Sequence, residues 1–192
     1  MLNSIARFSL AAVLSTGLST AFAAPITYEL DSSHSFAAFS YGHLGLTTQQ
    51  QRFNGTQGTI VLDTDAKTGS VEVTVDTTTI TTGHDGFDKQ IQGPEFLDTE
   101  AHPTATFKSS KIVFEGDAPV AVEGDLTIKG VTKPVTLAVT SFNAKEHPMV
   151  KKPVIGVNAE AVIKRSEFNA AKFVPAVDDE VTLRLVVEAI QP

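Results

Sequence analysis

The chain has 192 residues, no cysteine and a formal net charge of −7 at pH 7. The absence of thiols excludes cysteine nucleophiles, thiolate zinc sites and iron–sulfur clusters. The acidic balance provides no basic face for a nucleic-acid partner and no electrostatic attraction to anionic lipid surfaces. Because no disulfide can form, the fold must be stabilised by its hydrophobic core.

The N-terminal segment 1–23 is predicted to be a secretory signal peptide. Arg7 supplies the positive region, residues 8–14 form a short apolar core, and Ala21-Phe22-Ala23 is a small-x-small cleavage site. The apolar run is too short and too interrupted for a membrane span. We therefore expect an exported, periplasmic protein that starts at Ala24, has no transmembrane anchor, and forms one domain over residues 24–192.

Beyond this segment the chain has the composition and rhythm of a β-protein. Thr and Val are abundant and Trp is absent, which favours strands. Apolar and polar residues alternate over residues 26–30, 34–43, 48–62, 71–76, 105–114, 120–128, 135–142, 155–163 and 181–188. We expect about eight antiparallel strands in a sandwich or barrel, and the strand lengths favour a closed barrel. Gly55 and Gly58 mark a bend or a bulge.

The clearest hairpin is predicted over residues 124–137. Lys129-Gly130 provides the turn, because Gly tolerates a positive φ. Leu126, Ile128, Val135 and Leu137 are expected to face inward, and Thr127 and Thr136 outward. Pro134 lacks a backbone N–H, so it suits a strand start or a sheet edge.

Two segments interrupt the strand rhythm. In residues 83–100 the spacing of Phe87 and Ile91 fits one face of a short helix, which Gly93-Pro94 would end. Residues 165–174 are a second excursion of this kind. We expect the first of these to plug one end of the sheet.

Four stretches, in this order, carry a resemblance to a known family. They are Tyr28-Glu-Leu-Asp31 with His34-Ser-Phe36; Phe96-Leu-Asp98 with His102-Pro-Thr-Ala-Thr-Phe107; Gly124 to Val135; and Arg165-Ser-Glu-Phe168 with Asp179-Glu-Val181. In these stretches the chain resembles the YceI-like family of exported bacterial proteins. It departs from the family pattern at Asn169, where Gly is usual, but Asn also tolerates a positive φ.

The resemblance implies an extended lipocalin-like antiparallel β-barrel with a hydrophobic tunnel for a long isoprenoid or acyl chain. The expected ligand is a polyisoprenoid lipid or a prenylated quinone. A fatty acid or fatty amide and, less favoured, an enzyme acting on such lipids are the alternatives. The oligomeric state, a homodimer included, is left open.

Apolar, mainly aromatic side chains are the candidate ligand contacts. They are Phe36, Phe39, His43, Leu44, Phe53, Phe87, Phe96, Phe107, Phe114, Phe142, Phe168 and Phe173. Small residues at Ala37, Ala38, Ser40, Gly156, Ala159 and Ala161 are expected to leave a narrow slot rather than a round cavity. A long chain is expected to lie lengthwise in it, between the two excursions.

Polar chemistry is less well supported. The five His residues lack close ligand spacing, so no metal and no cofactor are expected. His34 and His43 are open to a second interpretation, in which they meet at a tunnel mouth and bind a polar head group. No Gly-x-Ser-x-Gly elbow occurs, and Asp178-Asp179-Glu180 is interpreted as a solvated turn. We therefore expect a binding protein without catalytic residues.

Overall fold

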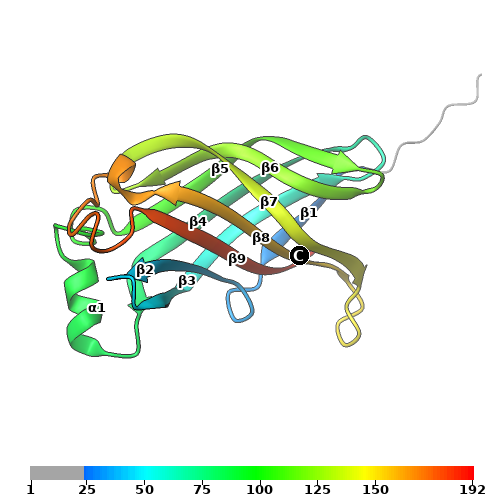
Figure 1. Cartoon of the computed structure of the whole chain (residues 1–192). Helices are drawn as coiled ribbons and strands as arrows, with labels where there is room; N and C mark the ends of the chain where they lie inside the picture. Colours follow the sequence, from blue (N-terminus) through cyan, green and yellow to red (C-terminus); the bar gives the residue numbers. More distant parts are fainter. Residues whose placement is uncertain (1–23) are drawn as a thin grey trace, which may run out of the picture.

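The computed structural model describes residues 24–192, and the predicted signal peptide lies outside the described residues. The strands are β1 (Ile26–Leu30), β2 (Phe36–His43), β3 (Thr47–Asp63), β4 (Thr68–Thr81), β5 (Thr104–Glu115), β6 (Ala118–Ile128), β7 (Val131–Glu146), β8 (Pro153–Lys164) and β9 (Glu180–Ile190). Helix α1 (Asp85–Gln92) lies between β4 and β5, and the 3-10 helix η1 (Arg165–Phe168) lies between β8 and β9 (Figure 1).

These strands form one closed antiparallel barrel. Their order is β1-β3-β2-β9-β8-β7-β6-β5-β4, and the pairing of β3 with β4 closes the sheet. Because β1 and β2 both pair with β3 on one side and β9 on the other, they share one position, and the barrel has eight strand positions. The predicted eight-stranded lipocalin-like barrel with short helical excursions is confirmed.

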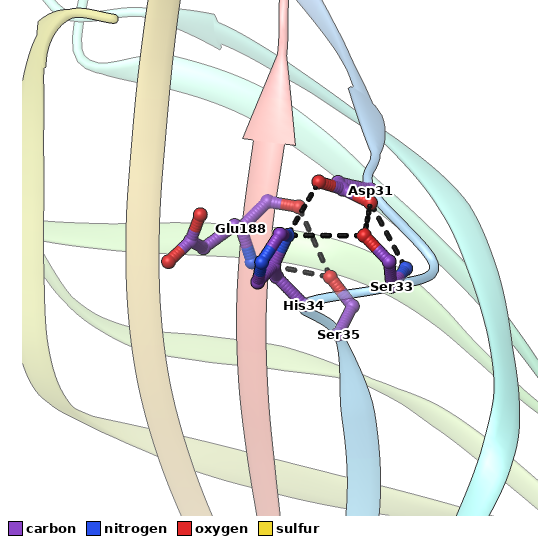
Figure 2. Close-up of polar contacts among 5 residues, drawn as sticks. All are labelled: Asp31, Ser33, His34, Ser35 and Glu188. Carbon is purple, nitrogen blue, oxygen red and sulfur yellow. Dashed lines mark hydrogen bonds and ion pairs between the residues drawn. The ribbon is translucent and has the colours of Figure 1, made fainter. Parts of the chain in front are cut away.

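A short turn interrupts the position that β1 and β2 share (Figure 2). The Asp31 carboxylate accepts hydrogen bonds from the Ser33 backbone N–H at 2.9 Å and the Ser33 hydroxyl at 2.6 Å. Opposite the break, the Ser35 hydroxyl donates to the Glu188 carbonyl oxygen at 3.0 Å and accepts from the Glu188 N–H at 3.1 Å. The hydroxyl thus bonds both backbone groups of Glu188, whose carbonyl oxygen also accepts from the Asp31 backbone N–H at 2.9 Å, so the break leaves neither group unpaired.

The longest strand, β3, bends where a glycine was expected to bend it. Its register with β4 shifts between Phe53 and Gly55, as in a β-bulge. The first part of β3 pairs with β2 and the last part with β1. Gly58 lies in regular pairing instead, and a Cβ there would come within 2.2 Å of the Glu72 carbonyl oxygen. Only one of the two glycines therefore marks a bulge.

The β6–β7 hairpin has the predicted turn and facing. Lys129 and Gly130 have φ values of 50° and 74°, in the left-handed region that a tight turn requires. Leu126 and Leu137 are buried, whereas their predicted partners on the inward face, Ile128 and Val135, are half-buried. The pairing of β7 with β8 explains why these two residues are more exposed.

Strands β7 and β8 separate near the β6–β7 turn. β7 pairs with β6 from Val131 onward, but its pairing with β8 begins only at Ala138. The edge that this leaves on β7 contains Pro134, in agreement with the prediction for this residue. Between β7 and β8 lies η1, whose Phe168 is 2% exposed. We call this gap, bounded by residues 131–137 and 161–164, the seam.

The irregular segments gather at one end of the barrel, which we call the mouth. Figure 1 shows α1, the segment after β8 and the β2–β3 turn together at the left. The β3–β4, β5–β6 and β7–β8 connections lie at the opposite, far end. The non-strand residues of this fold are therefore concentrated where the barrel interior opens.

Local sequence explains both excursions at the mouth. The His84 side chain caps α1 by accepting a hydrogen bond from the Phe87 N–H, and the helix ends at Gly93, before Pro94, as predicted. At the end of η1, Asn169 has φ 58° and ψ 31°. Asn therefore adopts the left-handed conformation expected of it.

Candidate functional site

A cavity of about 280 Å³ opens at the mouth of the barrel. The two excursions and the inward faces of β2, β3 and β9 enclose it. Apolar side chains from these elements form most of its wall, among them Phe39, Phe53, Phe87, Ile91, Phe96, Leu97, Phe168, Phe173 and Leu183. Such a wall suits an apolar ligand, because contact with it removes apolar area from water.

Two polar side chains of this wall, those of Tyr41 and Thr77, are bonded to the protein itself. The Tyr41 hydroxyl accepts a hydrogen bond from the buried Gln51 amide at 3.3 Å, and burial raises the pKa of Tyr41. The Thr77 hydroxyl donates to the His102 carbonyl oxygen at 2.9 Å. These pairings leave Tyr41 and Thr77 as supports of the wall rather than as a reacting pair.

One arginine organises the loop that carries Phe173. The Arg165 guanidinium donates hydrogen bonds to four backbone carbonyl oxygens, those of Ala170, Lys172, Val177 and Asp178. Desolvation lowers the pKa of Arg165, because burial disfavours the cation. Since one side chain satisfies so many carbonyl groups of this loop, Arg165 fixes its path around the cavity.

The residues after Arg165 are tied to the start of β9. The Asp179 carboxylate accepts hydrogen bonds from the Ser166 N–H at 2.8 Å and the Ser166 hydroxyl at 2.7 Å. The hydroxyl bond is the largest of the contributions that lower the pKa of Asp179. Asp179 is therefore more than the solvated turn residue that we predicted, because it anchors the first turn of η1.

A lysine in the β6–β7 turn joins the two excursions. The Lys129 ammonium donates to the Pro94 carbonyl oxygen at 2.6 Å and to the Asn169 carbonyl oxygen at 2.8 Å. Its backbone is left-handed, and a Cβ at the following Gly130 would come within 3.0 Å of the His102 ring. Lys129 and Gly130, the turn of the predicted hairpin, therefore hold the irregular segments at the mouth in place.

Side chains of the two excursions also meet directly. The Lys172 ammonium lies 2.5 Å from a carboxylate oxygen of Glu95. The rings of Phe96 and Phe173 have centroids 6.1 Å apart. Phe173 lines the cavity although it is 52% exposed. This ring therefore lies at the boundary between cavity and solvent.

The structure distributes the predicted contact residues over three places. Seven of them line the cavity at the mouth, which we call the large cavity to distinguish it from a smaller apolar cavity, namely Phe39, His43, Phe53, Phe87, Phe96, Phe168 and Phe173. Phe107 and Phe142 line a second apolar cavity of about 60 Å³ nearer the far end. Phe36, Leu44 and Phe114 line neither. The Phe36 ring instead lies 4.0 Å from the Arg52 guanidinium carbon, and Leu44 is 54% exposed in the β2–β3 turn.

The sequence prediction named mainly aromatic contacts and so left out the aliphatic residues of the cavity wall. They include Ile91, Leu97, Ile128, Ile163, Val181 and Leu183. The alternation of Val181 and Leu183 in the last strand was the signal available in the sequence, since alternate residues of a half-buried strand face the interior. Arg165 offered no such signal, because its acceptors belong to a loop of irregular path.

The small inward residues differ in part from our prediction. Ala159 and Ala161 are buried on the inward face of β8, and Ala37 packs against the core. Gly156, Ala38 and Ser40 alternate with inward residues and occupy the outward register, so our expectation for these three was wrong.

A glycine in β6 allows close packing against β5. At Gly124 a Cβ would lie 2.5 Å from the Lys108 carbonyl oxygen and 2.7 Å from the Phe107 ring, so a side chain there would displace one of them.

The two histidines proposed to share a head group do not meet. His34 precedes β2 (Phe36–His43), and His43 is the last residue of this strand. His34 lies in the turn before this strand, whereas His43 lines the cavity at the mouth. The hypothesis of a joint His34–His43 site is therefore wrong.

The turn before β2 contains a Ser, a His and an Asp in contact (Figure 2). His34 Nδ1 lies 3.0 Å from Ser33 Oγ and 2.7 Å from Asp31 Oδ2, and the Ser33 hydroxyl donates to Asp31. A catalytic triad requires the two different ring nitrogens for Ser and Asp. These exposed residues share one nitrogen and lie outside the cavity, so they lack triad geometry.

Hydrogen bonding in this turn changes two pKa values. The Ser33 hydroxyl, then His34, lowers the pKa of Asp31 to about 2. The hydrogen bond from His34 to Asp31 raises the pKa of His34. Both follow from stabilisation of the charged forms.

Residues 24–192 contain neither a cluster of metal ligands nor a membrane-spanning helix. Within residues 24–192, no three His, Asp or Glu side chains are grouped so that they would hold a metal ion. In the same part of the chain, no helix has the length and apolar character needed to cross a membrane.

Fold and cavity together define a class of protein. A closed antiparallel barrel of this size with an apolar opening at one end is the architecture that holds one small ligand in lipocalins. The chain belongs to the YceI-like family, since residues 28–189 match the YceI-like domain. Protein YceI of Escherichia coli O6:H1 is 34% identical over 173 residues, which cover 90% of each chain.

Solved structures have the same fold. The crystal structure of BcnA from Burkholderia cenocepacia superposes with a TM-score of 0.69 at 25% identity, covering 83% of this chain and 98% of that one. A polyisoprenoid-binding domain from Saccharophagus degradans has a TM-score of 0.66 at 18% identity, covering 87% of this chain and 99% of that domain. The second likeness concerns the fold alone.

Proposed function

We propose that the protein binds one long-chain lipid, a polyisoprenoid or a prenylated quinone, with its chain in the cavity at the mouth. The observation that carries this proposal is a cavity whose wall is mainly apolar and whose Tyr41, Thr77 and Arg165 side chains are already bonded to the protein. An apolar chain in the cavity takes no hydrogen-bond partner away from these three. The polyisoprenoid-binding domain of the same fold supports the choice of an isoprenoid.

The contacts that we assign fall into an outer and an inner group. The outer group comprises the seven predicted residues that line the large cavity. Phe107 and Phe142 would contact the end of a chain that reaches the smaller cavity. Burial of such a chain contributes about 25 cal/mol per Å² of apolar area, before the costs of association.

We further propose that the protein is exported to the periplasm as a single domain of residues 24–192. Residues 1–23 carry the features of a signal peptide. A free isoprenoid is poorly soluble in an aqueous compartment, so a barrel that encloses the chain would let it cross. The expected mature N-terminus is Ala24.

A panel of ligands tests the proposed function. Isoprenoid alcohols, a prenylated quinone, fatty acids and a fatty amide are each added to the mature protein, and the melting temperature is measured. The proposal predicts that the isoprenoids raise it most, because a ligand that binds only the folded state stabilises that state. A larger shift by the fatty acids would favour the fatty-acid alternative, and no shift by any member would contradict lipid binding.

The same panel separates a carrier from an enzyme. Esters of these lipids are incubated with the protein, and the release of free alcohol or acid is followed. The proposal predicts no release above that of a heat-denatured sample. Release that depends on folded protein would identify an enzyme acting on lipids.

A further inference from the structure

A third pocket, of about 320 Å³, lies in the seam between β7 and β8. Residues from both faces of these strands line it. Ile163 belongs to the inward face of β8 and Val162 to its outward face, where it is 62% exposed. On β7, Lys133 stands opposite the buried Leu126 and so has inward register, whereas Pro134 is exposed. The pocket is therefore lined from both faces of the sheet, at a gap in the barrel wall.

This pocket borders the large cavity. Ile163 and Phe168 line both spaces, and Phe168 is 2% exposed. No β-ladder closes the wall here, because β7 and β8 are paired only from Ala138 onward. The two side chains therefore form the partition between the cavity and the outer face of the barrel.

The seam pocket differs from the cavity in its charge. Lys133, Lys164, Glu167 and Glu180 line it. Within residues 24–192, none of these four side chains makes a hydrogen bond or an ion pair, so their charges are available to a ligand. Of these four residues, Lys133 occupies an inward-facing position of its strand, and its side chain is half-buried. A half-buried ammonium group gains most from an anionic partner.

We propose that the seam is a subsite for the polar end of the lipid, with the chain in the large cavity. In this arrangement the polar end passes between β7 and β8 beside Phe168, and its anionic group, a phosphate or a carboxylate, contacts Lys133. The inference rests on the proposed function, since it needs a chain in the cavity. It adds an anionic head group and a side opening to that function.

A charge-removing variant tests the subsite. Geranylgeranyl phosphate, palmitic acid and the uncharged geranylgeraniol are titrated into wild type and Lys133→Met. We expect the variant to bind the phosphate or the carboxylate about tenfold more weakly, as for loss of a charged hydrogen bond, and to bind geranylgeraniol unchanged. The anion that loses affinity identifies the head group.

Lys145→Met is the matched control. Lys145 is an exposed lysine of the same strand, paired with Val154 beyond the seam. Equal affinities of wild type, Lys133→Met and Lys145→Met for both anionic lipids would overturn the subsite while leaving lipid binding intact. Failure of wild type to bind any of the three lipids would overturn both the subsite and the proposed function.

Cross-linking locates the polar end directly. Geranylgeranyl phosphate with a diazirine beside the phosphate is bound, irradiated, and mapped by mass spectrometry of peptides. The proposal predicts labels in residues 131–137 and 161–168. Labels confined to the mouth, at residues 44–46 and 173, would overturn it, because the polar end would then leave along the barrel axis.

Discussion

The two ends of the barrel are stabilised in different ways. At the far end, regular hairpins pack Ile155 and its neighbours into an interior that leaves only about 60 Å³. At the mouth, irregular segments surround about 280 Å³, and polar contacts made by Lys129 and Arg165 hold them in place. A cavity removes apolar contacts that would otherwise stabilise the fold, so hydrogen bonds to backbone carbonyls take over this role.

This difference predicts which changes affect stability and which affect ligand binding. Substitutions at the far end should lower the free energy of unfolding with little effect on binding. Substitutions of Lys129 or Arg165, which hold the segments at the mouth, should affect both the free energy of unfolding and ligand binding. Surface turns outside these regions should affect neither strongly.

The largest effect is expected for Ile155→Ala. Ile155 is 1% exposed, and the truncation leaves a void in a closely packed region. We expect a loss of about 3 kcal/mol in the free energy of unfolding, measured in urea. Val150→Ala is the control, because Val150 is 53% exposed in the β7–β8 connection and its truncation should cost less than about 0.5 kcal/mol. Equal losses for the two variants would contradict the assignment of the core.

Compared with Ile155→Ala, we expect Arg165→Met to lose less stability but more of its ligand binding. The change removes the donor of four carbonyl groups, and we expect it to cost about 2 kcal/mol and to abolish the ligand-induced rise in melting temperature.

Arg184→Met controls for the loss of one guanidinium. Arg184 is half-exposed and pairs with Glu160 across two strands, so its removal should cost less than about 1 kcal/mol. An Arg165→Met protein that still binds lipid like wild type would show that the loop path does not depend on this brace.

The smallest effect is expected for Asp31→Asn in the turn between β1 and β2. The pKa of Asp31 is lowered to about 2, from about 3.9 in an unfolded chain, so its contribution to stability is complete above pH 4 and is lost as the pH falls toward 2. His34 has a raised pKa, so its contribution is complete below about pH 6.5 and is lost as the pH rises through the folded value.

Titration by NMR measures this coupling. Asp31→Asn should lower the pKa of His34 toward its ordinary value and flatten the acid limb of the stability curve between pH 4 and pH 2. Asp63→Asn, at the end of β3, should leave the His34 titration unchanged. An unchanged His34 titration in Asp31→Asn would contradict the hydrogen bond seen in Figure 2.

Most of the fold was predictable because its determinants are local. The alternation in the last strand, the Lys129-Gly130 turn and the tolerance of Asn169 for positive φ are each properties of a few neighbouring residues, and the structure confirms them. The gathering of the two excursions at one end also follows from strand order in a closed antiparallel barrel.

The candidate site was predictable only in part because it depends on register between distant strands. Whether Phe36 or Phe39 faces the cavity is decided by one residue of register against β9. The seam depends on where the pairing of β7 with β8 begins, and Arg165 depends on the path of a loop. Neither property is present in the pattern of a single segment.

Native mass spectrometry tests the central claim most directly. The protein is purified from its own organism without detergent, as wild type and as Leu183→Trp, which narrows the large cavity, with the outward Thr182→Trp as control. The account predicts one lipid mass per chain in wild type and Thr182→Trp, and little or none in Leu183→Trp. Equal lipid occupancy in all three proteins, or none in wild type, would contradict the assignment of the cavity at the mouth as the lipid site.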